Sequence, residues 1–409
     1  MLVNREKYLS KIRPFYDLDI IKVLMGSRRS GKSKILELII NELLEKGVDK
    51  NHIISINFED LSFEDIDDYK KLNTFIKEKV SNGSGKYYLF FDEIHHVKHF
   101  EKAINSFRVS MDCSIFITGS NSKMLSSEIS SLLTGRIIEF TIYPFSYDES
   151  IKLREINNFD IIKEPFYDYL KLGGYPFRFN LNMEQDIKAY LAELYNNICE
   201  KDIFARDSEI EKEKFNKVCK YILVNGGNDF NAETIYNYLK SNNHGQEYCA
   251  LSSIYNYIEK MEKAFLIVKV NRYNIAGKEA LKSNPKYYAM DNGFRIINAN
   301  SNDYDRGRFL ENVICLELLS RGYEVFIGKT YKGEVDFVAM KNGKKCFIQV
   351  AYILETNETI DREFNAFSPI KDASPKYVLS LDKIDMSKNG ITHLNIIDFL
   401  ENKVDLFLS

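Results

Sequence analysis

The sequence predicts an α/β protein whose N-terminal part is a parallel β-sheet covered by helices. Three observations lead to this prediction. Over the first 145 residues, apolar runs of strand length alternate with helical patterns. These runs are rich in β-branched and aromatic residues, and they do not alternate between apolar and polar positions. Strands buried on both faces have this composition, and a parallel sheet between layers of helices buries its strands in this way.

The elements of this sheet can be placed in order along the chain. The first strand is predicted at IIKVLM (20–25), and GKSKILELIINELLEKG (31–47) is an amphipathic helix that ends at a glycine cap. Four more strands are predicted, at HIISINFED (52–60), KYYLFFDE (86–93), CSIFITGS (113–120) and RIIEFTIYPF (136–145).

The remaining chain has a different pattern. It is mainly helical from about 150 to 210, with a break at LGGYP (172–176), and SIYNYIEKMEKAFLIVKVNRYN (253–274) predicts a helix followed by a strand. After the helix GRFLENVICLELLSRG (307–322), strands are predicted at YEVFIG (323–328), EVDFVAM (334–340) and KCFIQVAY (345–352).

Composition excludes several classes of protein. The 409 residues carry a net charge of −3, so no overall charge points to nucleic acid or a membrane surface. The apolar runs are far shorter than the ~20 residues that a membrane helix needs. The start has no apolar signal core, and the six cysteines are scattered without CxxC pairs. We therefore expect a cytoplasmic protein of two to four domains, with no membrane partner.

Residues 26–33, GSRRSGKS, match the phosphate-binding pattern G-x-x-x-x-G-K-[ST] between a predicted strand and a predicted helix. Lys32 is expected to reach the β- and γ-phosphates of ATP, and Ser33 to bind Mg²⁺. The competing interpretation is a glycine-rich helix cap. The residues predicted to contact the nucleotide are Gly26, Ser27, Arg28, Arg29, Ser30, Gly31, Lys32 and Ser33. For Arg28 and Arg29, contact with a partner or with solvent is equally open.

An acidic pair ends the strand YYLFFDE. Asp92 is predicted to hold Mg²⁺ at the carboxyl edge of the sheet, and Glu93 to orient and deprotonate the attacking water. The pair alone would fit a solvated turn, but its place after the phosphate loop in chain order favours a catalytic role. His96 and His99 lack a carboxylate at a recognised spacing, so no separate metal site is predicted there.

Two further groups are candidates for sensing or stabilising the γ-phosphate. Thr118, Ser120 and Asn121 end the strand CSIFITGS, and we favour Ser120 or Asn121 without choosing between them. Arg136 follows in LLTGRIIEF and could stabilise transition-state charge, in cis or from a neighbouring subunit. An action in trans would predict a homo-oligomer. A surface or salt-bridged arginine is the alternative.

With these motifs in place, the chain resembles a bacterial and archaeal family of AAA+-type P-loop ATPases. The resemblance rests on GSRRSGKS, FFDEIHH and FITGSNS, and continues in YPFSYDE, YLKLGGYP, RGRFLENVICLEL, EVDFV and FIQVAY. It implies four domains: an ATPase core (1–150), a helical lid (151–210), a winged-helix segment (211–295) and a restriction-endonuclease-like domain of unassigned function (296–409).

The C-terminal part has the layout of a PD-(D/E)xK nuclease but lacks part of its chemistry. Glu311 and Asp336 supply two acids, whereas Gln349 and Ala351 stand where a second strand acid and a lysine are needed. Glu334 or Lys345 would have to move into those roles. Nuclease activity is therefore not expected, and the fold would serve binding or packing.

Residues 259–295 suggest a contact with DNA. This stretch contains eight basic and four acidic residues. Its pattern predicts a helix followed by a basic β-hairpin, and a winged helix contacts the phosphate backbone of DNA with such elements. Solvated lysines or a protein partner explain the same charges.

Together these features predict a Mg²⁺-dependent ATPase that acts as a nucleotide-driven switch or motor, with DNA as the expected partner. The alternative is a scaffold or sensor that binds nucleotide without hydrolysis and contacts a protein. A kinase is less favoured, because no acceptor-binding segment follows Asp92 and Glu93.

Overall fold

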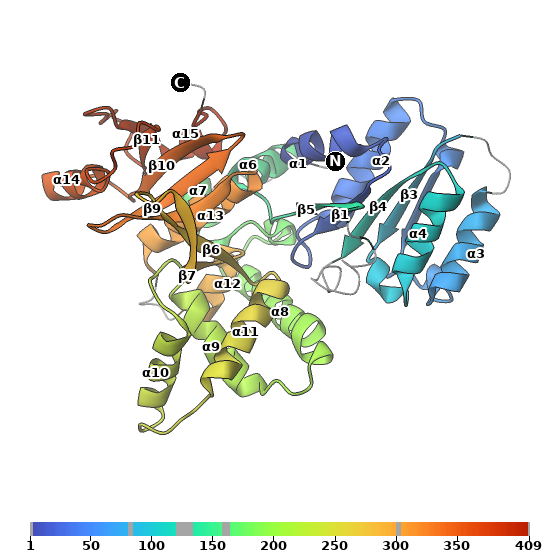
Figure 1. The fold of residues 1–409 in the computed structure, drawn as a ribbon, viewed down its shortest axis with the longest axis horizontal. Coiled ribbons are helices and arrows are strands. Elements are labelled where there is room, and N and C mark those ends of the chain that lie inside the picture. The colour runs from blue at the N-terminus through green and yellow to red at the C-terminus, as the bar shows by residue number, and fades with distance from the viewer. Residues whose placement is uncertain are drawn as a thin grey trace. The chain divides into compact units, whose positions relative to one another are not determined.

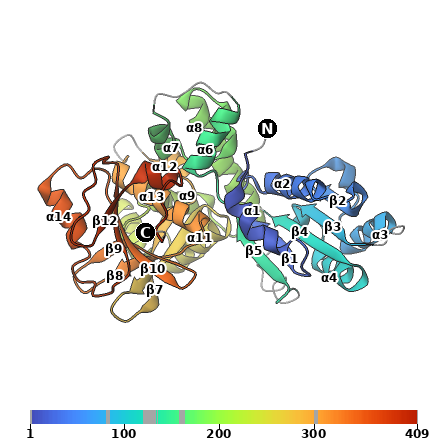
Figure 2. The same ribbon diagram turned by 90° about the horizontal axis from the view of Figure 1, so that it is seen from above.

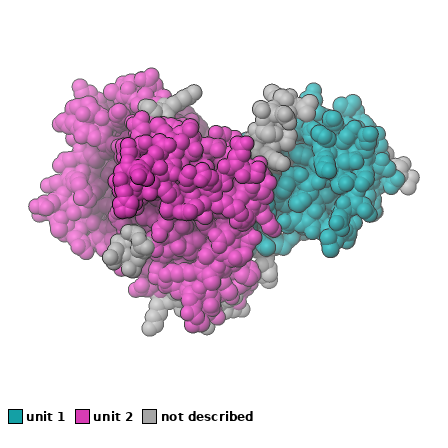
Figure 3. Space-filling model, turned by 90° about the horizontal axis from the view of Figure 1, so that it is seen from below, with its two compact units in different colours: residues 1–143 teal, residues 144–409 magenta. Residues whose placement is uncertain are grey.

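A computed structural model describes residues 3–80, 85–119, 133, 135–157, 164–299 and 304–407. The chain divides into two compact units, residues 1–143 and residues 144–409 (Figure 3). The domain boundaries predicted near residues 210 and 295 both fall within the second unit, and they stay predictions.

The first unit is built on a sheet of five parallel strands, as the buried apolar runs predict. Its strands are β1 (Ile21–Met25), β2 (Ile53–Asn57), β3 (Tyr87–Asp92), β4 (Cys113–Gly119) and β5 (Ile137–Thr141). The order in the sheet is β2-β3-β4-β1-β5, so β4 lies between β1 and β3. Every residue of β1, β3 and β4 is buried, which explains why their sequences are mainly apolar.

Helices cover both faces of this sheet, and α2 and α4 lie on opposite sides of it (Figure 2). The helices are α1 (Glu6–Ile12), α2 (Lys32–Glu45), α3 (Tyr69–Val80) and α4 (Phe100–Ser110). Adjacent residues of β3 show the two-sided burial: Phe90 packs in one core with α1 and α2, whereas the ring of Phe91 lies 6.2 Å from that of Phe107 in α4.

The second unit begins with helices and ends with a mixed sheet (Figure 1). Its helices are α6 (Tyr147–Ile156), α7 (Pro165–Leu172), α8 (Glu184–Ile198), α9 (Lys212–Val224), α10 (Ala232–Asn242), α11 (Leu251–Lys263), α12 (Asn292–Asn298), α13 (Arg306–Ser320), α14 (Asn357–Asn365) and α15 (Ile396–Leu400). Three helices and an antiparallel strand pair, in the order α9-α10-α11-β6-β7, occupy the stretch for which we expect a winged helix. That assignment stays a prediction.

Seven strands form one sheet in the order β12-β11-β10-β9-β8-β6-β7. They are β6 (Ile267–Asn274), β7 (Glu279–Ala289), β8 (Glu324–Lys329), β9 (Glu334–Lys341), β10 (Lys344–Val350), β11 (Lys376–Ser380) and β12 (Thr392–Asn395). β6 pairs in parallel with β8, so the hairpin of the predicted winged helix and the C-terminal strands share this sheet. Along β9, Phe337 faces a core that includes α13, and Val338 faces a core that includes α14.

The LGGYP break is explained by a buried carboxylate. Asp291, at the N-terminus of α12, accepts the backbone N–H of Gly174 at 2.6 Å and that of Gly293 at 2.7 Å. A Cβ atom at Gly173 would lie 1.7 Å from the Asp291 side chain, and one at Gly174 would lie 2.0 Å from the carbonyl oxygen of Phe145. Close packing therefore requires glycine at both positions. The two glycines follow the last residue of α7 and leave room for the Asp291 carboxylate.

Two global expectations can be compared with the structure. All six cysteines are buried and none forms a disulfide. Among the described residues, no helix is long and apolar enough to span a lipid bilayer.

Candidate functional site

The loop between β1 and α2 has a backbone that requires glycine at both ends. Gly26 has a φ of 148°, and a Cβ atom there would lie 2.2 Å from the carbonyl oxygen of Ile142. Gly31 has a φ of 99° and caps α2, which begins at Lys32. A buried strand thus turns directly into a helix whose first N–H groups have no intrahelical acceptor, and such a helix start attracts anions.

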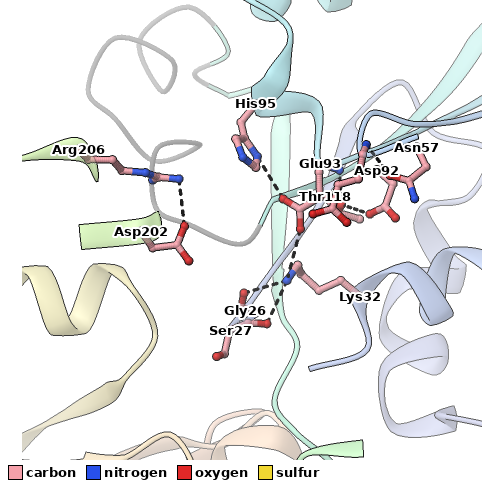
Figure 4. Close-up of polar contacts among 11 residues, drawn as sticks. Gly26, Ser27, Lys32, Asn57, Asp92, Glu93, His95, Thr118, Asp202 and Arg206 are labelled. Atoms are coloured by element: carbon pink, nitrogen blue, oxygen red, sulfur yellow. Dashed lines mark hydrogen bonds and ion pairs between the residues drawn. The ribbon is translucent and has the colours of Figure 1, made fainter. Parts of the chain in front are cut away.

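Lys32 lies buried beneath this loop. Its ammonium donates to the carbonyl oxygens of Gly26 at 3.1 Å and Ser27 at 3.0 Å, and it lies 3.9 Å from Oε1 of Glu93 (Figure 4). Ser30 Oγ is buried and has no hydrogen-bond partner within the part of the chain that the structure describes. The loop therefore holds a buried cation and an unsatisfied hydroxyl group, and phosphate oxygens can bind to both.

An arginine from the N-terminal segment braces the loop from behind. Arg5 is 2% exposed, and its guanidinium donates to the carbonyl oxygen of Ser30 at 2.8 Å and to that of Tyr143 at 2.9 Å. The group also lies 4.5 Å from the ring centre of Tyr8. Arg5 thus ties the phosphate loop to the end of β5. The sequence alone suggested no role for this residue.

The position of β4 between β1 and β3 brings a hydroxyl group to the acidic pair. Thr118 Oγ1 donates to Oδ1 of Asp92 and accepts the backbone N–H of Glu93 at 2.9 Å. Burial raises the pKa of the Asp92 carboxyl, and hydrogen bonds from Ser33 and Thr118 oppose that rise. Ser33 and Asp92, predicted to share a metal ion, thus lie within hydrogen-bonding contact of each other.

Glu93 lies between two positively polarised neighbours. Its backbone is left-handed, with a φ of 53°, so the chain reverses immediately after β3. Oε2 of the carboxylate lies 3.1 Å from Nδ1 of His95, while Oε1 faces Lys32 (Figure 4). Burial alone would raise the pKa of Glu93, but the His95 contact and the charge of Lys32 outweigh it and lower the pKa to about 2. Glu93 is consequently ionised at neutral pH.

Not every predicted site residue joins this group. Ser120 and Asn121 lie outside the described residues. Arg136 precedes β5, its carbonyl oxygen accepts the N–H of Ile21 at the start of β1, and its guanidinium donates to Asn105 at 3.1 Å. The phosphate loop follows the opposite end of β1, so the geometry of this unit gives no support to an action of Arg136 in cis. An action in trans stays a prediction.

The two arginines within the loop differ in their surroundings. Arg28 is half-buried, and its charge contributes to the lowered pKa of Glu93. Arg29 is exposed and has a φ of 64°. Arg28 thus lies near the acidic pair, whereas Arg29 faces solvent at the turn of the loop.

The donor set fits the magnesium ion expected with ATP. Asp92 supplies a carboxylate and Ser33 a hydroxyl group, both hard oxygen ligands, and the phosphates of a nucleotide would complete the coordination. Among the described residues there is no group of three or more His, Cys, Asp or Glu side chains suited to a metal ion.

In the second unit, Glu311 and Asp336, the two acids predicted for a nuclease-like site, accept hydrogen bonds from other groups of the protein. Glu311 accepts the hydroxyl of Tyr288 at 2.6 Å, Asp336 accepts the N–H of Val350 at 2.8 Å, and the Gln349 side chain accepts the N–H of Asp336 at 3.3 Å. Burial, and then the charge of Glu311, raise the pKa of Asp336 well above its usual range. Burial and the repulsion between the two acids favour a pair that retains a proton, whereas the hydrogen bonds from Tyr288 and Val350 oppose it.

The substitutes considered for the missing nuclease residues are engaged elsewhere. Glu334 lies 3.2 Å from Lys286 and also pairs with Arg272, and Lys345 pairs with Asp372 at 2.7 Å. Ala351 is buried in an apolar core. Glu334 and Lys345 are thus engaged in other contacts, and the expectation that this region does not cleave DNA stays a prediction.

The basic stretch 259–295 is less available than its composition suggests. Five of its eight basic side chains form ion pairs or are buried, namely Lys260, Lys263, Arg272, Lys286 and Arg295. Burial lowers the pKa of Arg295 to about 10. Lys269 and Lys278 are exposed, and the side chain of Lys282 lies outside the described part. The case for DNA contact from this stretch is therefore weaker than the count of charges implies.

Comparison with known families defines the class of the protein. Residues 19–151, which contain the phosphate loop and the acidic pair, match the family described as an AAA domain. Residues 163–303 match a domain of unknown function, DUF8612. The fold and the match together make the first unit a nucleotide-binding domain of an AAA-type P-loop ATPase.

Two relatives extend over nearly the whole chain. An uncharacterized protein of Haemophilus influenzae is 32% identical over 407 residues, which is 98% of each chain. The uncharacterized protein MJ1544 of Methanocaldococcus jannaschii is 34% identical over 381 residues, 90% of this chain and 81% of its own. The chain belongs to the family that these two proteins represent.

Two solved structures resemble the chain distantly. The Walker-type ATPase PABY2304 of Pyrococcus abyssi aligns with 73% of this chain and 96% of its own, with a TM-score of 0.49 and 18% identity. The Aeropyrum pernix ORC1 protein in complex with DNA aligns with 76% of this chain and 92% of its own, with a TM-score of 0.31 and 14% identity. At these values neither structure assigns a property to the chain.

Proposed function

We propose that the protein binds ATP at residues 26–33, hydrolyses it with Asp92 and Glu93, and uses the cycle to switch its interaction with a partner. The observation that carries this proposal is the meeting of Lys32, Thr118 and the acidic pair at one edge of the sheet. The start of α2 and the ends of β3 and β4 bring these groups to one place, and a buried lysine beside two buried acids is typical of functional sites.

The binding step follows from the contacts of Lys32. Its ammonium is held by the carbonyl oxygens of Gly26 and Ser27, and these are weaker partners than phosphate oxygens, which carry full charge. A triphosphate would replace them, with the N–H groups at the start of α2 and the hydroxyl of Ser30 as further donors.

Asp92 and Ser33 would hold magnesium beside the phosphates. When bound, the ion supplies charge neutralisation and polarisation of the γ-phosphoryl group. The Thr118 hydroxyl keeps the Asp92 carboxylate facing this position. Because burial raises the pKa of Asp92, a nearby cation would favour its ionised form.

Glu93 would act on the attacking water. The charge of Lys32 helps to lower the pKa of Glu93, and phosphates bound to Lys32 would offset that charge, so the carboxylate would become a better proton acceptor. The water oxygen then bonds to the γ-phosphorus, the bond from that phosphorus to the bridging oxygen of ADP breaks, and the water proton moves to Glu93. The products are ADP and inorganic phosphate.

We further propose DNA as the partner, through exposed lysines of the stretch 212–289. Lys269 and Lys278 are exposed near the β6–β7 hairpin. A groove of ≈ 660 Å³ between α9 and α10 adds Lys220 and the half-exposed ring of Tyr238, whereas Lys217, which also lines it, pairs with Glu213 at 3.1 Å. Lysines beside an aromatic ring suit contact with a nucleic acid strand. A protein partner is the alternative to DNA. The helical lid predicted at residues 151–210 also stays a prediction.

The experiment that tests this function is steady-state hydrolysis of Mg-ATP by the full chain, with and without duplex DNA. We expect turnover in the wild type, no measurable turnover in Glu93→Gln, and a higher rate when DNA is present. Turnover without a response to DNA would reject DNA as the partner. Tight ATP binding without turnover would reject the enzyme and leave a nucleotide-gated scaffold.

A further inference from the structure

The histidine two residues after the proposed base is held against it. His95 belongs to the short 3-10 helix Ile94–His96, and its side chain is 16% exposed. The left-handed turn at Glu93 reverses the chain, so that the His95 ring returns to the Glu93 carboxylate and Nδ1 lies 3.1 Å from Oε2 (Figure 4). Ile94, which is fully buried, anchors this turn in the core.

The two oxygens of Glu93 have different surroundings. Oε2 is engaged by His95, on the side away from the loop, and Oε1 lies 3.9 Å from the ammonium of Lys32. A carboxylate anchored at one oxygen cannot rotate freely about its last bond. Oε1, which faces Lys32, is therefore aimed at the place where Lys32 would meet the phosphates and where water would attack.

We propose that His95 is a positioning residue for hydrolysis: its Nδ1–H binds Oε2 of Glu93 and thereby directs Oε1 at the water that attacks the γ-phosphate. This inference rests on the proposed ATPase function. It assigns His95 no proton transfer, because the Nδ1 atom of His95 lies against Oε2, whereas Oε1 faces Lys32.

The neighbouring histidines do not share this arrangement. His96 is exposed, and its ring packs on that of His95 with 4.5 Å between the ring centres. His99 is also exposed and lies 3.7 Å from Glu101 rather than Glu93. His99 therefore provides a control for the loss of a histidine in the same segment.

The test compares three variants of the full chain with the wild type and Glu93→Gln. His95→Leu removes the donor at similar volume, His95→Asn can place an amide nitrogen near the position of Nδ1, and His99→Asn is the control. The kcat and KM for Mg-ATP are measured with the Kd for a non-hydrolysable ATP analogue. We expect kcat to fall about tenfold or more in His95→Leu, with KM and Kd within about twofold of the wild type.

The amide variant separates positioning from packing. We expect His95→Asn to recover kcat to within about threefold of the wild type and His99→Asn to match it. If His95→Leu does not fold, His95→Gln replaces it, since its amide nitrogen reaches the position of Nε2 and loses the contact.

Three outcomes would overturn the inference. They are an unchanged or raised kcat in His95→Leu, an equal loss in His95→Asn and His95→Leu, and a change confined to KM. The two proposals can fail separately. A wild type without turnover rejects the ATPase itself, whereas turnover that requires Glu93 but not His95 rejects only the positioning role.

Discussion

The side-chain oxygen of Thr118 contacts both acidic residues of the site, donating to the Asp92 carboxylate and accepting the backbone N–H of Glu93 at 2.9 Å. Because β4 lies between β1 and β3, this one hydroxyl group links the proposed metal ligand to the proposed base. It fixes the left-handed backbone of Glu93, which in turn sets the direction of the carboxylate.

Replacement of Thr118 therefore tests the geometry of the acidic pair. Thr118→Val keeps the shape but leaves the buried N–H of Glu93 without its acceptor, at a cost of about 1–3 kcal/mol. We expect ATP turnover to fall by about tenfold or more. Thr118→Ser, which keeps the hydroxyl group, should retain most of the rate. Equal rates in Thr118→Val and the wild type, measured by phosphate release, would remove Thr118 from the site.

Removal of the Arg5 brace should weaken nucleotide binding. Arg5→Met leaves the carbonyl oxygens of Ser30 and Tyr143 without a charged donor, and each such hydrogen bond is worth about 1.5–3 kcal/mol. We expect the Kd for an ATP analogue, measured by calorimetry, to rise about tenfold or more. Lys50→Met, which removes an exposed charge from the same unit, is the control. An unchanged Kd in Arg5→Met would show that the loop keeps its conformation without the brace.

The glycines of LGGYP should not tolerate a side chain. A methyl group at Gly173 overlaps the Asp291 carboxylate, and one at Gly174 overlaps the carbonyl oxygen of Phe145. We expect Gly173→Ala and Gly174→Ala each to lower the free energy of unfolding by about 3 kcal/mol or more. Gly307→Ala, in the first turn of α13, should change it by less than about 1 kcal/mol. Thermal denaturation measures all three, and melting temperatures like the wild type's for the first two variants would contradict the packing.

Asp291 should make stability depend on pH. Burial raises its pKa to about 6, above the value of an unfolded chain, so the folded state binds the proton more tightly and stability falls as pH rises through about 4 to 6. Asp291→Asn lacks this titration, although it also loses one acceptor for Gly174 or Gly293. We expect the wild type's advantage over the variant to shrink by about 1.5 kcal/mol between pH 5 and pH 7.5. Urea denaturation at both pH values measures it, and a constant difference would be contrary to expectation.

The sequence predicted the first unit well because its signals are local. A phosphate loop is encoded by neighbouring residues, and buried strands are continuously apolar, so the five strands and the positions of Lys32, Asp92 and Glu93 could be read in order. The same locality explains why LGGYP was recognised as a break but not understood. Its cause, Asp291, lies 117 residues away from the N–H of Gly174 that it accepts.

The parts that the sequence did not provide depend on tertiary contacts. Thr118 was considered at the end of its strand but passed over for Ser120 and Asn121, because sequence does not show which polar group faces the neighbouring strand. Arg5 acts on residues 25 and 138 positions away. A charge count could not reveal that Arg272 and its basic neighbours already have acidic partners or are buried.

The central claim is that one site both binds ATP and cleaves it with Glu93. The most direct measurement is the identity of the nucleotide retained after incubation with Mg-ATP and rapid gel filtration, for the wild type, Lys32→Ala and Glu93→Gln. The account predicts ADP with the wild type, no nucleotide with Lys32→Ala, and intact ATP with Glu93→Gln. ADP retained by Glu93→Gln at the wild-type rate, or ATP retained by Lys32→Ala, would contradict it.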